Sequence, residues 1–109
     1  MLRPHVLLAG DAAARPQGLE RALTRAGFLL VEVEEASSGQ PVDAVLLTVS
    51  DADPARLRHL LPPDDAPPRV VLVAASDPEA PAAALSAGAD DALALPVHLP
   101  ELCARLHAR

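Results

Sequence analysis

The residue types that carry enzyme chemistry are few in this sequence and lie far apart. The four histidines fall in different segments, where surface positions are the default: His5, His59, His98 and His107. His98 and Glu101 are three residues apart, but two ligands indicate a zinc site only weakly. Cys103 is the only cysteine, which excludes an intramolecular disulfide and a cysteine-built metal site. No nucleophile with an adjacent base and no metal cluster can be assembled, so we expect no enzyme activity.

The glycines do not supply a phosphate-binding loop either. Their spacing lacks the Gly-x-Gly-x-x-Gly pattern and suits turns and helix caps instead. The positions concerned are Gly10, Gly27, Gly39 and Gly88.

Length and composition describe one acidic domain covering residues 1–109. The chain has 50% hydrophobic residues and a formal net charge of -6, and a chain of this size buries enough surface for one core. No apolar run is long enough to cross a membrane and no signal peptide is recognisable, so we expect a cytoplasmic protein without membrane contact. With no lysine and a single aromatic residue, Phe28, nucleic-acid binding by this segment is not expected.

The elements that must position any site are strands alternating with helices. Four short runs are apolar throughout, which predicts parallel strands covered on both faces: 6–9, 45–49, 70–73 and 92–95. A fifth strand over 28–33 continues into Glu34 and Glu35, as is typical of an exposed edge strand.

The spacing of apolar residues predicts the first helix. Leu19, Ala22, Leu23 and Ala26 form one apolar stripe, and Gly27 follows where a helix C-cap belongs. In contrast, residues 34–42 have room for one helical turn at most. A parallel crossover normally carries a helix, so we expect the second helix to be shortened or missing and one sheet face to be thinly covered.

Three further helices are predicted from their ends. Asp53 and Pro54 indicate an N-cap and first residue for a helix that stops before residue 62. Asp77 and Pro78 repeat this pattern for an alanine-rich helix closed by Gly88, although Pro81 leaves its first residue open. The last helix, from about residue 100, has one apolar face, which predicts a buried thiol. That face contains Leu99, Leu102, Cys103 and Leu106.

Residues 68–97 resemble the fourth strand, fourth helix and fifth strand of response-regulator receiver domains of two-component signalling, the CheY-like superfamily. The most specific part is the run Gly-Ala-Asp-Asp at 88–91 followed by Leu95 and Pro96. Residues 43–47 resemble the third strand, and 5–27 the first strand and helix. The resemblance implies a flavodoxin-like, doubly wound α/β fold with a five-stranded parallel sheet in the order 2-1-3-4-5, a structural role for Asp90 and Asp91, and a cis peptide bond before Pro96.

The same resemblance implies a phosphoryl-accepting site that is degenerate here. Thr48 stands at the position of the acceptor aspartate and cannot form an acyl phosphate. Gly10 and Asp11 stand where an acidic pair binds Mg²⁺, so one carboxylate remains. The remaining pocket positions have also lost their usual side chains: Val73 or Ala74 for the hydroxyl, Leu95 for the lysine and Ala92 for the aromatic residue. We therefore expect no aspartyl phosphorylation and no cofactor, with Asp11 at best a weak Mg²⁺ ligand.

Each residue of this degenerate site also has a simpler interpretation. For Asp11, the favoured one is a solvated carboxylate near a helix start. Thr48 is better explained as a hydrogen-bonded β-branched residue at the end of a buried strand than as a hydroxyl phosphorylation site. Asp51 and Asp53 lie just beyond it and are alternative acceptors, although Asp53 is better explained as a helix cap.

These observations favour a phosphorylation-independent module for protein interaction or dimerisation. The partner is a second copy, through residues of about 78–109 or a second surface at 37–41, another protein, or an effector domain attached after Arg109. Two alternatives stay open. The chain is a phosphorelay receiver with a relocated acceptor at Asp51, Asp53 or Asp11, or it senses a small neutral ligand in the cleft at the strand carboxyl ends.

Overall fold

The computed structural model describes residues 3–51, 53–61, 67–74 and 77–108. Its centre is a five-stranded parallel sheet in the order β2-β1-β3-β4-β5, which confirms the predicted fold class. The strands are β1 (His5–Gly10), β2 (Leu29–Val31), β3 (Ala44–Val49), β4 (Arg69–Val73) and β5 (Asp91–Ala94). The apolar runs thus form the strands that were predicted from them.

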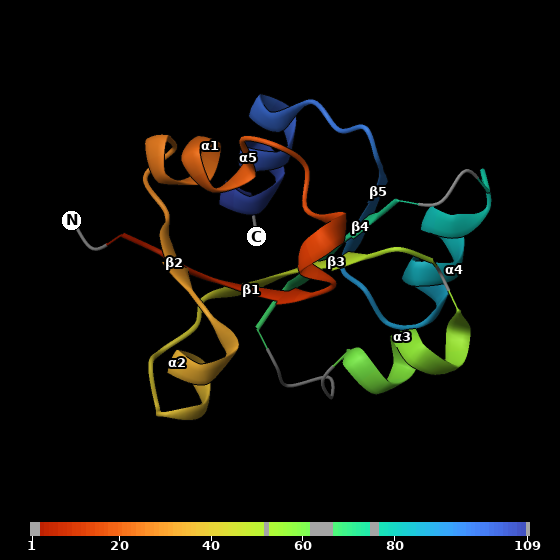
Figure 1. Cartoon of the computed structure of the whole chain (residues 1–109), viewed down its shortest axis with the longest axis horizontal. Coiled ribbons are helices and arrows are strands. Elements are labelled where there is room, and N and C mark those ends of the chain that lie inside the picture. Colours follow the sequence, from red (N-terminus) through yellow and green to blue (C-terminus); the bar gives the residue numbers. More distant parts are fainter. Residues whose placement is uncertain (1–2, 52, 62–66, 75–76, 109) are drawn as a thin grey trace.

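Helices cover both faces of the sheet (Figure 1). On one face lie α1 (Leu19–Arg25) and α5 (Leu99–His107), and on the other lie α2 (Val33–Ser37), α3 (Pro54–Leu60) and α4 (Ala80–Ser86). A short 3-10 helix, η1 (Ala12–Ala14), follows β1 directly. Among the described residues, no helix is long and apolar enough to span a membrane.

Two hydrophobic cores lie between the helices and the sheet, one on each face. On the α1 and α5 side, alternate residues of β1, β3 and β4 pack against Leu19, Leu23, Leu102 and Leu106. On the other side, the intervening residues of β3 and β4 pack against Leu57 of α3 and the alanines of α4. All residues of β3 and β4 are buried, as the uninterrupted apolar runs predict for inner strands of a parallel sheet.

The first and last helices follow the prediction closely. Gly27 has φ +97°, the left-handed conformation that suits the residue after a helix, and α1 ends just before it. In α5 the predicted apolar face is the buried one, and Cys103 is a buried thiol whose pKa is raised by that burial.

One capping prediction was confirmed in position only, and a second was wrong. Asp53 stands at the N-cap position of α3, but its side chain makes no capping hydrogen bond. The alanine-rich helix begins at Ala80 with Glu79 at the N-cap, so Asp77 lies outside it. The Asp77 side chain instead accepts a hydrogen bond from the Glu79 N–H (2.9 Å), which tightens the turn before the helix. Pro81 is accommodated in the first turn, where a missing N–H costs no helical bond.

The second helix is shortened, as predicted, and spans five residues. The edge strand is shorter than the predicted 28–33, because Val33 already belongs to α2. Glu32 and Glu35 form a capping box, in which the side chain of each residue accepts a hydrogen bond from the backbone N–H of the other. Arg15 also pairs with Glu32 at 3.4 Å. These polar contacts hold a helix that buries none of its residues.

Candidate functional site

Gly10 and Thr48 close the carboxyl edge of the sheet between β1 and β3. They are register partners at the last position of the β1 and β3 pairing. Gly10 has φ +89°, and a Cβ built on it would lie 2.2 Å from the Thr48 carbonyl oxygen. The Asp11 N–H donates to the same oxygen at 2.7 Å. The chain at position 10 therefore has no room for any side chain, acidic or otherwise.

The Thr48 hydroxyl is buried and hydrogen-bonded. Only 1% of the residue is exposed, and its Oγ1 donates to the backbone oxygen of Asp11 at 3.1 Å, with the Ala9 oxygen at 3.4 Å. The interpretation of Thr48 as a satisfied β-branched strand residue is confirmed. A hydroxyl that is enclosed in this way presents no nucleophile to solvent.

Asp11 lies near a helix start, at the N-cap of η1, as predicted, but its partly exposed carboxylate forms an ion pair instead of being solvated alone. Arg56 Nη1 donates to Oδ2 at 2.9 Å, and Arg56 Nη2 donates to Oδ1, so the guanidinium holds both carboxylate oxygens. The Ser50 N–H also donates to Oδ2 at 3.0 Å. These hydrogen bonds hold the pKa of Asp11 far below its ordinary value, and the one from Arg56 has the larger effect.

Arg56 is the site residue that sequence reasoning missed. It is the third residue of α3 and lies 45 positions from Asp11 in the chain. The available signal was topological: Asp11 follows β1, α3 follows β3, and these neighbouring parallel strands end at the same edge. A basic residue in the first turn of such a helix can reach the acid after the neighbouring strand.

The remaining positions of the predicted pocket carry only apolar side chains. Val73 is fully buried and Ala74 is exposed at the end of β4. Ala92 packs against the α3 and α4 core, whereas Leu95 packs against the core on the α1 and α5 side. The peptide bond between Leu95 and Pro96 is cis, as the resemblance implied.

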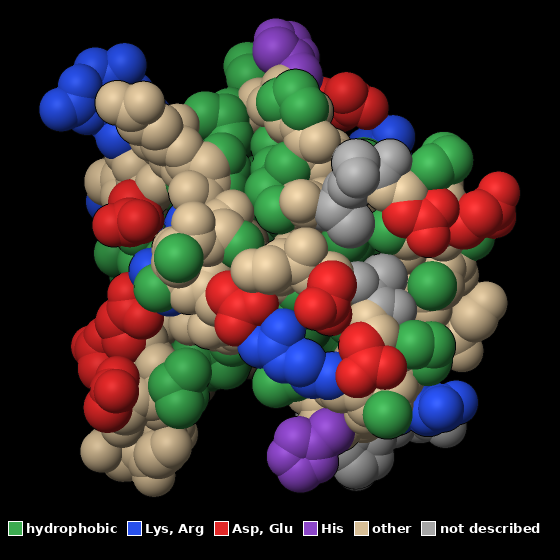
Figure 2. Space-filling model, turned by 45° about the vertical axis from the view of Figure 1, so that its right-hand side comes forward, with side chains coloured by type: hydrophobic (Ala, Val, Ile, Leu, Met, Phe, Trp, Pro, Cys, Tyr) green, Lys and Arg blue, Asp and Glu red, His purple; other side chains and the backbone are tan. Residues whose placement is uncertain are grey.

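Asp51 and Asp53 are exposed residues of the loop before α3. The Asp53 N–H donates to Asp51 Oδ1 at 3.3 Å. The pKa of the Arg56 guanidinium is raised, mainly by its hydrogen bond to Asp11. The negative charges of Asp51 and Asp53 raise it further, by smaller amounts. In the face seen in Figure 2, basic and acidic side chains lie beside one another near the middle of the surface.

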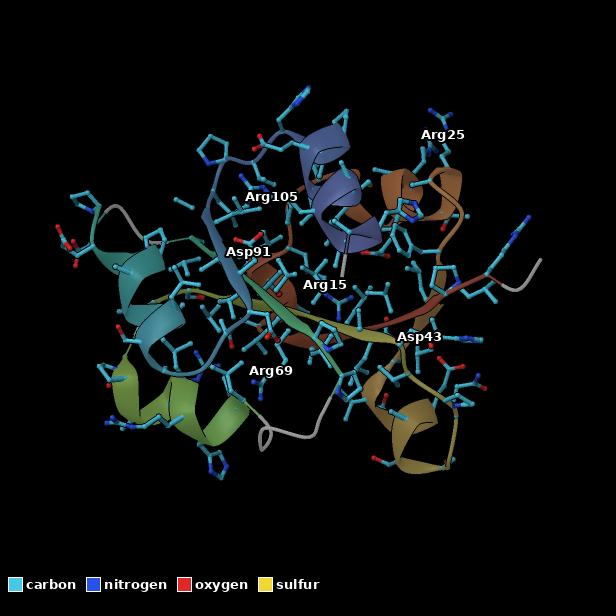
Figure 3. The ribbon with its side chains drawn as sticks, turned by 180° about the vertical axis from the view of Figure 1, so that it is seen from behind. Arg15, Arg25, Asp43, Arg69, Asp91 and Arg105 are labelled. Carbon is cyan, nitrogen blue, oxygen red and sulfur yellow. The ribbon has the colours of Figure 1, made fainter. Side chains whose placement is uncertain are left out.

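Asp90 and Asp91 have the structural role that the resemblance implied. The Asp90 side chain accepts a hydrogen bond from the Arg69 N–H at 2.7 Å, and the Arg69 guanidinium donates to the Gly88 carbonyl at 2.8 Å. Asp91 on β5 and Arg105 on α5 point toward each other in Figure 3, and Arg105 Nη1 lies 3.0 Å from Asp91 Oδ2. These contacts join β4, β5 and α5.

The histidines do not converge on a site. His107 stacks on Phe28, with ring centroids 4.2 Å apart, and bonds to the Ala26 oxygen at 3.0 Å. His98 is the N-cap residue of α5. Within the described residues, no three side chains of His, Cys, Asp or Glu gather as metal ligands would.

The residues at the carboxyl edge do not fit a divalent cation. Mg²⁺ needs oxygen ligands that are free to coordinate it. Both oxygens of Asp11 are already held by Arg56, Gly10 offers no ligand, and the Thr48 hydroxyl is directed to backbone oxygens. No step of a metal-assisted reaction can be derived from this arrangement.

No protein-family profile and no curated protein matches the sequence, but solved structures match the fold. A putative response regulator from Chloroflexus aurantiacus has a TM-score of 0.72 and 25% identity, over 98% of this chain and 97% of that one. The receiver domain of Francisella response regulator 1452 has a TM-score of 0.73 and 21% identity, over 96% and 94%. An orphan response regulator of H. pylori has a TM-score of 0.68 and 22% identity, over 96% and 94%. The chain has the fold of CheY-like receiver domains.

Proposed function

We propose that residues 1–109 form one receiver-like signalling unit that acts through protein interaction and without aspartyl phosphorylation. The observation that carries this proposal is the bidentate pair between Asp11 and Arg56. Asp11 stands at the remaining acidic position, and both of its carboxylate oxygens are held by the Arg56 guanidinium. The burial of Thr48 supports it further, because the residue at the acceptor position is neither acidic nor accessible. A fold alone does not carry an activity when the groups of its site are absent.

The interaction surface that we favour lies within residues of about 78–109. No residue between Ala80 and Ala89 is charged, and Leu85 on α4 is 47% exposed. Beside α4, β5 is an edge strand whose outer backbone groups face away from the sheet. Hydrophobic side chains reach the surface on the side where α4 lies (Figure 2). We propose that a second copy of the chain occupies this surface. Another protein or an attached effector segment is the alternative partner.

Intact-mass measurement after incubation with acetyl phosphate and Mg²⁺ tests the lack of phosphorylation. We expect no added phosphoryl group, since acyl phosphate formation needs an available carboxylate and a cation beside it. Hydroxylamine treatment distinguishes an acyl phosphate from a stable ester. An adduct that hydroxylamine removes would overturn the proposal. Asp51→Asn, Asp53→Asn and Asp11→Asn variants would then locate the acceptor and establish a phosphorelay receiver instead.

One observation favours a second function, the sensing of a neutral small ligand. A groove of about 490 Å³ lies beside the carboxyl ends of the strands, and its lining includes Pro16, Leu95, Pro96 and Val97. Apolar lining with few polar groups suits an uncharged ligand. Titration with neutral aromatic fragments, followed by amide shifts of Leu95 and Val97, tests this function. Shifts confined to these residues would support it, and unchanged spectra at millimolar fragment would exclude it.

A further inference from the structure

The amino-terminal end of the sheet is incompletely covered on the face where α2 lies. Val6 and Leu30 pack against the core on the α1 and α5 side, so the residues before them, His5 and Leu29, face the other side of the sheet. His5 and Leu29 are register partners, and the Asp43 N–H donates to the His5 carbonyl at 2.8 Å. These three residues therefore form one row, in which Leu29 is still 39% exposed.

Two hollows adjoin this row. The first has a volume of about 460 Å³, and its lining consists of Arg3, Pro4, His5, Pro41 and Asp43. The second has a volume of about 370 Å³, and its lining consists of Glu34, Glu35, Ser38 and Gln40. Since Gln40 and Pro41 are neighbours in the chain, the two hollows lie on either side of one short segment between α2 and β3.

The helix beside these hollows leaves an apolar side chain exposed. α2 buries none of its residues, and its first residue, Val33, is 49% exposed. Leu29 and Val33 are two of the three exposed large hydrophobic residues in the described part of the chain. Exposed apolar side chains that polar residues surround are typical of interaction sites. We call Leu29, Val33 and the linings of the two hollows the α2 surface.

The charge of this segment specifies the kind of partner. The sequence has no Lys, Arg or His between residues 26 and 55, but it has four acidic residues from Glu32 to Asp43. The Asp43 side chain is 59% exposed, and acidic side chains gather on the side of the molecule where α2 lies (Figure 2). A second copy in a symmetric contact would place the same acids against each other, and like charges repel. The α2 surface therefore favours a positively charged partner.

We infer that the α2 surface binds a short basic segment of another protein. In this complex an apolar side chain of the partner enters the hollow beside His5 and packs on Leu29. Arginine or lysine side chains of the partner pair with Asp43 and Glu34. The inference rests on the proposed function, in which the chain acts through protein interaction, and it adds a partner class and a surface separate from residues 78–109.

A fluorescent peptide of alternating arginine and leucine is the probe, and fluorescence anisotropy measures its binding to the unmodified chain. We expect binding that weakens as NaCl is added, because salt screens exposed charges. The same peptide with serine in place of leucine should bind roughly 10-fold more weakly, since it cannot fill the hollow. A peptide of alternating glutamate and leucine should not bind.

Substitutions locate the bound peptide. Glu34→Gln and Asp53→Asn are a matched pair, because each converts one exposed carboxylate into an amide. Asp53 follows β3, whereas the first hollow lies before it. We expect Glu34→Gln to weaken binding roughly 3-fold and Asp53→Asn to leave it unchanged. Leu29→Thr, which keeps a residue suited to a strand, should weaken binding roughly 5-fold.

Several results would overturn the inference. They are no binding of the arginine–leucine peptide, equal binding of the serine peptide, or equal losses in Glu34→Gln and Asp53→Asn, which would indicate net charge alone. A dimer of the unmodified chain that Leu29→Thr dissociates would assign the surface to a second copy. Circular dichroism checks folding, and Val33→Thr replaces Leu29→Thr if that variant unfolds. The proposed function fails separately, through a hydroxylamine-labile adduct on the unmodified chain.

Discussion

Gly10 controls the geometry of the carboxyl edge through both its backbone and its missing side chain. Its φ of +89° is one that other residues adopt only with strain. Its Cα also faces the Thr48 carbonyl so closely that a Cβ would lie 2.2 Å from the oxygen. Since that oxygen belongs to the backbone of an inner strand, it cannot move aside at low cost.

Comparison of Gly10→Ala with Gly39→Ala separates these two effects. Gly39 has φ +99°, but nothing lies within 4 Å of a Cβ built on it. We expect Gly39→Ala to lower the free energy of unfolding by about 1–2 kcal/mol, from backbone strain alone. Gly10→Ala adds a collision with backbone, and we expect a loss of more than about 3 kcal/mol. Urea unfolding measures both values, and equal losses would show that the close approach to Thr48 is not restrictive.

At the scale of elements, the Asp11 pair joins the segment after β1 to α3. Within its span, α3 buries only Leu57. The pair adds charge-assisted hydrogen bonds at a partly exposed position, where 27% of the Asp11 side chain is accessible. We expect the ion pair to fix the position of the start of α3 more than to stabilise the whole sheet.

Acid should remove this contribution. The pKa of Asp11 is lowered in the folded chain, so the stabilisation is present above the unfolded pKa of about 3.9 and is lost as the pH falls below it. We expect Asp11→Asn to lower the free energy of unfolding by about 1–2 kcal/mol at pH 7. The difference from the unmodified chain should shrink between pH 4 and pH 2, as urea unfolding at each pH would measure.

The exposed aspartate Asp51, in the loop before α3, supplies the control for this series. Asp51→Asn changes the net charge equally but leaves the Arg56 pair intact. A difference between Asp11→Asn and the unmodified chain that stays constant from pH 7 to pH 2 would contradict the assigned pair.

At the scale of the whole molecule, two surfaces are candidates for self-association. Leu85 marks the face of α4 and β5, and Val33, which is 49% exposed, marks α2 near the short crossover. We expect light scattering after size exclusion to show a dimer at high protein concentration, and Leu85→Glu to shift it to monomer. Val33→Glu should leave the dimer unchanged. Dissociation by Val33→Glu alone would place the interface at α2, and a monomer at millimolar concentration would exclude both surfaces.

The strands and most helices followed from the sequence because they depend on local patterns, whereas the sheet order came from the resemblance to receiver domains. Apolar runs, the stripe that includes Leu23, and Gly27 after it are readable within a few residues. The pair of Asp11 and Arg56 was missed, since it joins residues 45 positions apart and can be found only by combining the strand order with the position of Arg56 in the first turn of α3. Asp53 shows the limit of such patterns: it is the N-cap residue before Pro54, as predicted, but its side chain makes no capping hydrogen bond.

The contact between Gly10 and the Thr48 carbonyl also bears on how this chain could change over generations. An aspartate at position 48 would place a charged acceptor where the hydroxyl now donates to backbone oxygens, and an acid at position 10 would collide with the neighbouring strand. Either replacement alone gives a less stable protein without a working site. A phosphorylatable edge would therefore require several simultaneous changes in this chain.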